Sequence, residues 1–440
     1  MKRLFYIILD LLIVYGSILL SYFIMSQLEM LENFQDNIEA FKVTVPFIGI
    51  FYILLRYVFG LYTIDRKNIN ELIYAILLVS VLLTVGIMGI GFFVRGVALA
   101  FPRSVILLSA LFYFILLSFW RVLLVFINRK VHEVKKITII GDKDSKLSEA
   151  IMNKYPHQYK IESKCTDFGV STDFEAMIQS IDEVFMFAGI PQGIRREILS
   201  ISIKYKKEVF FVPEYFDLSI MGAMFNKLDD IPTYRINRIE LSQEDEFVKR
   251  VADIILACVA MIIAFPFAIV AALLVKLDGG PIMYSQERLT KDNKSFKILK
   301  FRTMIPNAEK LSGPVLAGED DPRITKIGKL MRLVRMDELP QLINVFKGEM
   351  SFVGPRPERP FFVEQFEQEM PEYNYRSAVK AGLTGLAQIE GKYNTSVGNK
   401  LRYDLIYINN YSLWQDFLII LRTIKILFVK SSTEGVSAKK

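Results

Sequence analysis

The segment Val251–Leu277, VADIILACVAMIIAFPFAIVAALLVKL, is an apolar run long enough to cross a bilayer, and a proline lies at its midpoint. Lys249 and Arg250 precede the run, and further basic residues follow it. Positive charge on both sides favours a cytoplasmic location for both ends. Pro266 removes a backbone donor, so the helix can bend there and turn back. A re-entrant membrane helix over residues 250–277 is the preferred interpretation, and a proline-kinked spanning helix is the alternative.

Four more apolar runs occupy the first third of the chain. Each approaches the ~20 residues that a helix needs to cross ~30 Å of hydrocarbon. The first run is too long for a signal peptide, and no small-residue cleavage site follows it. We therefore expect a four-helix transmembrane bundle over residues 1–130, with helices at about Leu4–Met25, Phe47–Leu61, Leu72–Val94 and Ser104–Ile127.

The charges in the loops orient this bundle. Lys2 and Arg3 precede the first run, and Arg129 and Lys130 follow the fourth, whereas the segment 29–39 is acidic. Arg95 and Arg103, in the third loop, deviate from this pattern. The positive-inside rule predicts that both ends of the bundle face the cytoplasm.

A soluble α/β pattern begins near residue 131. Ile137–Asp142, Glu183–Ala188 and Glu208–Val212 are typical of buried strands, with helical stretches between them. These features predict a Rossmann-like middle domain over residues 131–235. Only Gly141 stands where a dinucleotide fingerprint needs three glycines, so a degenerate scaffold is favoured over a cofactor domain.

Charge and composition direct the search for chemistry to the C-terminal part. The whole chain carries a net charge of +7, and residues 247–440 hold 28 Lys and Arg against 20 Asp and Glu, which is +8. This basic excess suits anionic lipid, nucleic acid or a phosphorylated substrate. The two cysteines do not indicate a disulfide framework or a zinc site, and no histidine follows His157. Catalysis there must use carboxylates, hydroxyls, amines or an oxygen-bound metal.

Six short phrases in this part form an ordered set. The phrases are QER at 286–288, FKILKFRTM at 296–304, DPRIT at 321–325, RMDELPQ at 335–341, GPRPE at 354–358 and GLTGLAQ at 382–388. The set resembles the catalytic domain of the bacterial sugar transferases, the polyprenyl-phosphate hexose-1-phosphate transferases of the monotopic phosphoglycosyl transferase superfamily. The resemblance covers about residues 246–440, and the bundle and middle domain in front of it resemble the large form of that family.

The resemblance implies a two-step reaction at the acidic pair Asp337 and Glu338. Asp337 would attack the sugar-bearing phosphate of a UDP-sugar, UMP would leave, and a lipid phosphate would then take the phosphosugar. The expected substrates are undecaprenyl phosphate and UDP-glucose or UDP-galactose, and the expected cofactor is Mg²⁺ with Asp337 as its ligand. We expect no nucleic-acid partner, and a homo-oligomer remains open. The resemblance implies a multi-pass protein of the bacterial inner membrane with a cytoplasmic catalytic domain that begins capsule or exopolysaccharide synthesis.

The sequence around Asp337 offers a physical reason for an ionised carboxylate. Asp337 precedes an apolar helix-like run at 339–350 with Pro340 in its first turn. The positive end of such a helix would lower the pKa of Asp337. The simpler alternative is an ordinary helix cap.

Four basic residues within the phrases are candidates for substrate phosphate. Lys300 and Arg302 flank Phe301, so they would share one face of an extended strand. Arg356 lies between two prolines that stiffen its backbone, as suits an arginine that clamps a phosphate. Arg323 is the fourth candidate.

Two other functions remain as alternatives. A nucleotide-sugar oxidoreductase or epimerase could act through the middle domain, although the missing glycines oppose it. A membrane scaffold or regulator of polysaccharide assembly could retain the fold without the activity. No residue can be assigned to the sugar hydroxyls, so the sequence does not select the sugar.

Overall fold

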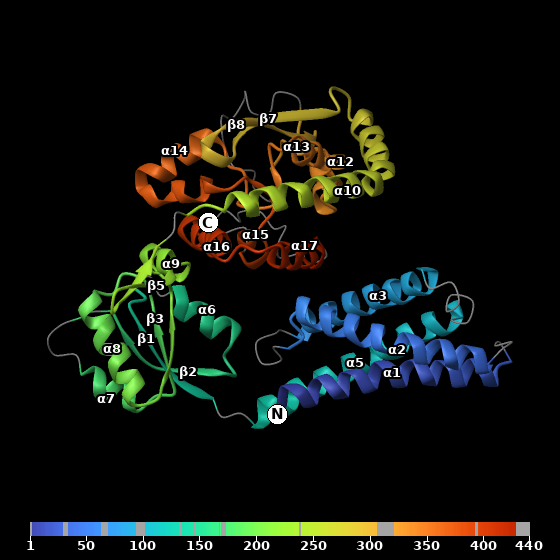
Figure 1. The fold of residues 1–440 in the computed structure, drawn as a ribbon, viewed down its shortest axis with the longest axis horizontal. Coiled ribbons are helices and arrows are strands. Elements are labelled where there is room, and N and C mark those ends of the chain that lie inside the picture. Colours follow the sequence, from blue (N-terminus) through green and yellow to red (C-terminus); the bar gives the residue numbers. More distant parts are fainter. Residues whose placement is uncertain are drawn as a thin grey trace. The chain divides into compact units, whose positions relative to one another are not determined.

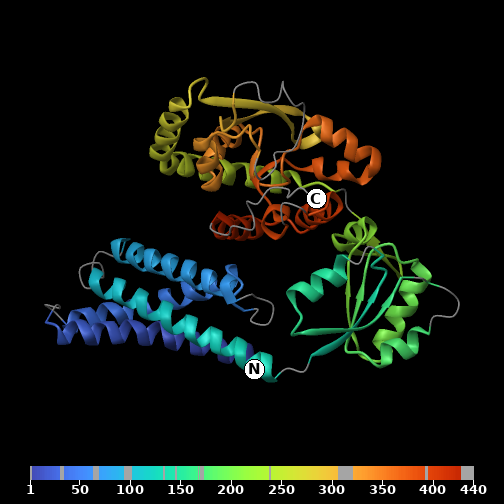
Figure 2. The same ribbon diagram turned by 180° about the vertical axis from the view of Figure 1, so that it is seen from behind.

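The computed structural model describes residues 2–29, 34–62, 69–93, 102–131, 134–143, 146–166, 168, 173–236, 239–305, 321–391 and 395–427. The chain forms two compact units, Met1–Val212 and Pro213–Lys440. Figures 1 and 2 show the fold of these units from opposite sides.

The first unit begins with long apolar helices that confirm the predicted bundle. Each contains a stretch that is long and apolar enough to cross a membrane. α5 packs along α1 and α3, and α2 packs against α3. The helices are α1 (Lys2–Gln27), α2 (Phe34–Val58), α3 (Ile69–Phe93) and α5 (Arg103–Val131).

A buried charge cluster joins three of these helices. Asp10 of α1 pairs with Arg121 of α5, and Arg56 of α2 lies 3.1 Å from the same carboxylate oxygen. Arg121 also donates to the carbonyl of Leu61 at 2.8 Å. Charges inside a membrane bundle are costly unless they are paired. The cluster therefore fixes the order and depth of the three helices.

The middle region is a parallel sheet with the strand order β2-β1-β3-β4. Its central strand β1 (Lys135–Ile140) pairs with β2 (Tyr159–Cys165) and β3 (Glu183–Met186), and β3 pairs with β4 (Glu208–Phe211). Three of these strands were predicted. β2 was missed because its partly buried and exposed residues alternate within a polar segment, YKIESKC, instead of forming an apolar run.

Helices cover both faces of this sheet (Figure 1). Ile137 and Ile139 pack toward α6 (Lys146–Lys154), and Ile140 and Val184 pack toward α7 (Phe174–Gln179) and α8 (Gln192–Lys204). This two-sided burial produces the Rossmann-like layers.

The first turn of this sheet differs from a dinucleotide site. Gly141 has φ +85 and turns the chain after β1. The Asp142 carboxylate then accepts hydrogen bonds from the N–H and the hydroxyl of Ser148, both at 2.8 Å. The Asp142 carboxylate thus binds the backbone N–H of Ser148 in the first turn of α6. A dinucleotide-binding fold would place a pyrophosphate at this helix end.

The second unit consists of short strands and helices around one long helix. Its first helix, α9 (Tyr215–Met221), lies in the segment predicted as middle domain but packs against α16, where Asn409 donates to the carbonyl of Leu218 at 2.7 Å. The other elements are β5 (Met224–Leu228), β6 (Ile231–Arg235), α10 (Gln243–Leu277), β7 (Met283–Leu289), η1 (Lys291–Asn293), β8 (Ser295–Phe301), α12 (Lys326–Leu333), η2 (Met336–Glu338), α13 (Gln341–Lys347), β9 (Ser351–Val353), α14 (Pro360–Glu369), η3 (Pro371–Ala378), β10 (Gly382–Thr384), α15 (Leu386–Glu390), α16 (Val397–Asn409) and α17 (Leu413–Leu427).

The N-terminal half of α10 is built into this unit. Lys249 forms a buried ion pair with Asp416 of α17. Asp253 accepts hydrogen bonds from the Ser351 hydroxyl and the Phe352 N–H, both at 3.0 Å. Lys249, one of the two basic residues before the apolar run, therefore anchors the helix in the core of this unit.

The C-terminal half of α10 returns to the same unit. Figures 1 and 2 both show the helix changing direction sharply along its length, and Pro266 lies inside it. Ala271 and Val275 pack against Phe301 and Met331. Both halves of α10 therefore contact one unit, as a bent helix requires. The entry of this helix into a membrane stays a prediction.

Candidate active site

The acidic dyad, Asp337 and Glu338, lies in the short 3₁₀ turn η2 between α12 and α13. Arg335 precedes it with φ 56, a left-handed conformation that is uncommon for a residue with a side chain. The Asp337 side chain is buried, and its Oδ1 atom has no hydrogen-bond partner among the described residues. A buried acceptor without a partner is costly, so a donor or cation that reached this oxygen would be bound favourably.

Three cations surround the other carboxylate of the dyad. The Oε1 atom of Glu338 lies 3.5 Å from the Lys300 ammonium, 3.4 Å from the Arg356 guanidinium and 4.0 Å from the Arg335 guanidinium. Lys300 comes from β8 and Arg356 from the loop after β9. The structure therefore brings together four residues that the sequence predicted, namely Asp337, Glu338, Lys300 and Arg356.

The two carboxylates have opposite pKa shifts. Burial, with the adjacent Glu338 charge, raises the pKa of Asp337 from 3.8 to about 6, although Lys300 and Arg332 act against it. Burial also favours a higher pKa for Glu338, but Lys300, Arg356 and Arg335 outweigh it and hold that pKa at about 2. Glu338 is thus a permanent anion, whereas Asp337 is the more basic carboxylate. Such separation is typical of paired carboxylates with different tasks.

The predicted lowering of the Asp337 pKa by a helix end is wrong. The helix α13 begins at Gln341, and Pro340 is its N-cap, so Asp337 does not cap it. The influence of a helix end falls off within one turn. Burial in the 3₁₀ turn therefore determines the direction of the shift.

Arg302 lies outside the cluster around Glu338. The strand β8 ends at Phe301, so the alternation that placed Arg302 beside Lys300 stops one residue too early. Its guanidinium donates to the carbonyls of Pro281 at 2.8 Å and Val275 at 3.2 Å, and also to that of Gly279. These contacts hold the end of α10 to β8.

Arg323 binds Asp321, which belongs to the same sequence phrase, DPRIT. Its Nε atom donates to Asp321 Oδ1 at 2.9 Å, and this arginine lowers the pKa of Asp321 to about 2. Arg332, which no phrase contained, donates to the Thr303 hydroxyl at 2.9 Å and acts against the rise in the Asp337 pKa. Only its position shortly before the dyad in the sequence could have indicated it.

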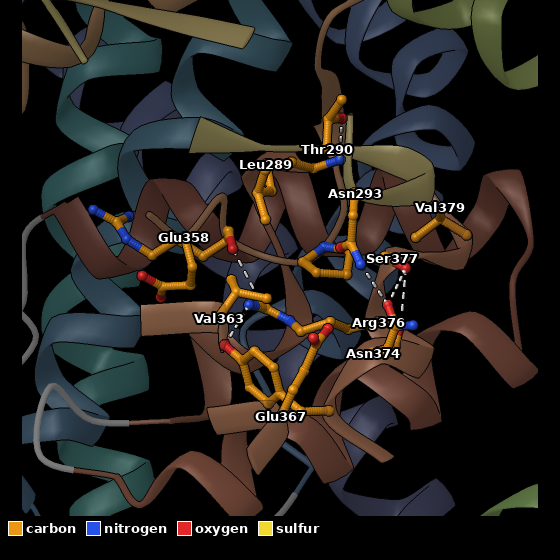
Figure 3. A pocket seen from close by; sticks show the side chains of 14 residues that line it. Leu289, Thr290, Asn293, Glu358, Val363, Glu367, Asn374, Arg376, Ser377 and Val379 are labelled. Atoms are coloured by element: carbon orange, nitrogen blue, oxygen red, sulfur yellow. Dashed lines mark hydrogen bonds between the residues drawn. The ribbon is translucent and has the colours of Figure 1, made fainter. Parts of the chain in front are cut away.

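A pocket beside the dyad shares Arg356 with it. Arg356, Glu358, Tyr373 and Arg376 line the pocket, together with polar residues that include Asn374 (Figure 3). The loop that carries Arg356 is held tightly, because a Cβ at Gly382 would come within 2.1 Å of the Gly354 nitrogen. Only glycine permits this approach of two backbone segments.

The described residues contain no group of three or more His, Cys, Asp or Glu side chains that could hold a metal. Mg²⁺, however, is commonly bound by one or two carboxylates together with substrate phosphates. The unpaired Oδ1 atom of Asp337 fits this mode, so the residues present are compatible with a metal that arrives with a phosphorylated substrate.

The fold and the site together define a membrane protein with an acidic dyad and cations suited to a phosphorylated ligand. A family profile described as "Bacterial sugar transferase" matches residues 244–430. The galactosyl transferase CpsE of Streptococcus agalactiae serotype III is 30% identical over 359 residues, which are 74% of this chain and 78% of the relative. The chain belongs to the bacterial sugar transferase family, as its sequence phrases predicted.

Two other relatives match over nearly half of this chain. The UDP-N-acetylgalactosamine-undecaprenyl-phosphate N-acetylgalactosaminephosphotransferase of Aeromonas hydrophila is 41% identical over 203 residues, 45% of this chain and 48% of the relative. The UDP-glucose:undecaprenyl-phosphate glucose-1-phosphate transferase of Escherichia coli K12 is 35% identical over 223 residues, 49% of this chain and 48% of the relative. The chain thus spans about half the length of these two relatives.

Proposed function

We propose that this protein transfers a sugar 1-phosphate from a UDP-sugar to undecaprenyl phosphate, the first membrane step of capsule or exopolysaccharide synthesis. The unpaired, buried Oδ1 atom of Asp337, beside a carboxylate that holds three cations, carries this proposal. The names of the relatives supply the substrate classes, and those names include glucose, galactose and N-acetylgalactosamine. UDP-glucose and UDP-galactose remain the donors that we favour.

In the first step Asp337 attacks the phosphorus that carries the sugar. A bond forms between the carboxylate oxygen and phosphorus, and the bond from that phosphorus to UMP breaks, with the electron pair leaving on UMP. In the second step an oxygen of undecaprenyl phosphate attacks the same phosphorus and releases the Asp337 carboxylate. Covalent catalysis of this kind divides one difficult transfer into two easier ones.

The surrounding cations stabilise the charge that develops on the transferred phosphoryl group. Lys300 and Arg356 approach Glu338 from two different segments, so both are already oriented before substrate binds. Preoriented charge contributes most in a site that excludes water. The pKa of Glu338 near 2 keeps it ionised, and we propose that it holds these cations in place beside Asp337.

Mg²⁺ belongs to this proposal because Asp337 presents an unpaired oxygen. When bound, the ion would neutralise phosphate charge. Removal of divalent cations with EDTA should abolish UMP release, and added MgCl₂ should restore it. UMP release that persists in EDTA rejects the metal.

The re-entrant helix explains how two very different substrates reach one site. The middle of α10 exposes large apolar side chains, for example Ile262 at 76% and Phe265 at 66%, while both ends pack on the catalytic unit. We propose that this middle part enters the cytoplasmic leaflet of the bacterial inner membrane. A lipid phosphate at the interface and a cytosolic UDP-sugar could then both contact Asp337.

The direct test is a panel of UDP-sugars assayed for UMP release with undecaprenyl phosphate as acceptor. UDP-glucose, UDP-galactose and UDP-N-acetylgalactosamine are compared, and one of them should support release. Asp337→Asn should abolish release while the protein remains folded. If the wild type is inactive with the whole panel, the alternative of a non-catalytic scaffold of polysaccharide assembly is favoured instead.

A further inference from the structure

The Arg356 side chain is 45% exposed, so apart from its ion pair with Glu338 its direction depends on its backbone. Two partly buried arginines donate hydrogen bonds to that backbone. Arg376 donates from Nη2 to the carbonyl of Arg356 at 2.8 Å, and Arg288 donates from Nη1 to the carbonyl of Pro357 at 3.1 Å. Both bonds are made to the segment that carries the cation of the dyad.

Arg376 is itself held from two further directions. Its Nε atom donates to Asp404 at 3.0 Å, and its Nη1 atom donates to the Tyr373 hydroxyl at 2.7 Å (Figure 3). The Arg376 and Asp404 side chains are 12% and 2% exposed. A planar guanidinium can reach three partners in fixed directions, whereas a lysine ammonium cannot reproduce that fork. Arg376 thus links the α16 residue Asp404 to the Arg356 backbone.

We propose that Arg376 is a positioning residue that aims Arg356 at the dyad and at the substrate phosphate. Pro355 and Pro357 restrict the backbone on either side of Arg356, so fixing the carbonyl between them sets the direction of the side chain. The Arg356 guanidinium then lies 3.4 Å from Glu338. This inference rests on the proposed function. It also explains the role of the ion pair between Arg376 and Asp404.

Arg402 provides a matched control within the same unit. Like Arg376, it donates to a backbone carbonyl, that of Pro213 at 2.8 Å, and it lies over a tyrosine ring, that of Tyr215. The corresponding ring for Arg376 belongs to Tyr373. Arg402 differs in that its carbonyl partner is not part of the segment that bears Arg356.

The test is a double-mutant cycle on UMP release, with Arg376→Lys, Arg356→Lys and the double variant. A misplacement of about 1 Å can cost about 100-fold, so we expect Arg376→Lys to lower kcat/KM for the UDP-sugar about 10- to 100-fold. The double variant should be no worse than Arg356→Lys alone, because both changes remove the same interaction. Arg402→Lys should retain kcat/KM within about threefold, as expected for a change with no shared partner.

Two outcomes would overturn the inference. In the first, the losses of the two single variants multiply in the double variant, which would mean that Arg376 acts independently of Arg356. In the second, Arg402→Lys and Arg376→Lys lose equal activity, which would indicate a general effect on folding. A thermal unfolding curve of each variant identifies any that fails to fold, and Tyr373→Phe, expected to give a smaller loss of the same kind, then replaces Arg376→Lys. A wild type that releases no UMP refutes the proposed function and this role together, whereas multiplied losses in an active enzyme refute only this role.

Discussion

Replacing the buried carboxylate of Asp337 should stabilise the protein. Asp337→Asn keeps the size of the side chain but removes a charge that burial and Glu338 disfavour. The unfolded chain loses the Asp337 proton near pH 4, whereas the folded protein holds it up to about pH 6. The folded state therefore binds more protons in this window, and the contribution of Asp337 to stability falls as pH rises through it.

The size of the effect follows from the shift. One pKa unit corresponds to about 1.4 kcal/mol, so a rise from 3.8 to about 6 means that ionised Asp337 costs about 3 kcal/mol at pH 8. In a domain of this size each kcal/mol moves Tm by about 2–4 °C, so the unfolding temperature should rise by roughly 6–12 °C. A stability gain from removing a catalytic group is a known consequence of strain at active sites.

The assay is thermal unfolding of the purified membrane protein in one detergent at a series of pH values. The gain of Asp337→Asn should be largest at pH 8 and shrink steadily toward pH 4. Asp321→Asn is the control of opposite sign, because Arg323 stabilises the ionised form of Asp321 and its replacement should lower Tm. An Asp337→Asn protein that unfolds at or below the wild-type temperature at pH 8, or a gain independent of pH, would refute the reasoning.

Three further changes test other parts of the site. Because Asp337 must be ionised to attack, kcat for UMP release should rise as pH increases through about 6, and a kcat unchanged between pH 5 and pH 7 would contradict this. Lys300→Met should lower kcat/KM for the UDP-sugar about 100-fold, because it removes one donor that stabilises the developing charge. The control is Lys297→Met, at an exposed position of the same strand, which should not lower kcat/KM. Equal losses in the two variants would exclude a specific role for Lys300. Arg302→Lys should lower Tm, since hydrogen bonds from charged groups contribute about 1.5–3 kcal/mol each. The kcat/KM of the folded variant should change little. A variant that loses activity at an unchanged Tm would instead indicate that Arg302 binds the substrate.

The architecture could be predicted because each apolar run extends over many residues, so many residues carry the same signal. Four apolar runs predicted the bundle, and the proline within Val251–Leu277 predicted the bend of α10. The strand β2 was not predicted because its partly buried positions alternate with exposed ones in a polar segment. Its place in the sheet depends on tertiary pairing with β1, which no local pattern records.

The site was predictable in its residue types and less so in its geometry. The phrases identified the dyad, Lys300 and Arg356, which the structure brings together. Arg302 was grouped with Lys300 because the strand was assumed to continue, but β8 ends before it. The direction of the Asp337 pKa could not be derived, because it depends on burial by residues distant in sequence. Arg332 and Arg376 act through folded contacts that a linear motif does not show.

The most direct test of the covalent mechanism is mass spectrometry of the protein incubated with an accepted UDP-sugar in the absence of undecaprenyl phosphate. We expect a phosphosugar adduct on the peptide that contains Asp337, and this adduct should disappear when the lipid phosphate is added. The Asp337→Asn protein should form no adduct. An active enzyme that never carries this adduct, or that carries it on another residue, would contradict the assignment of Asp337 as nucleophile.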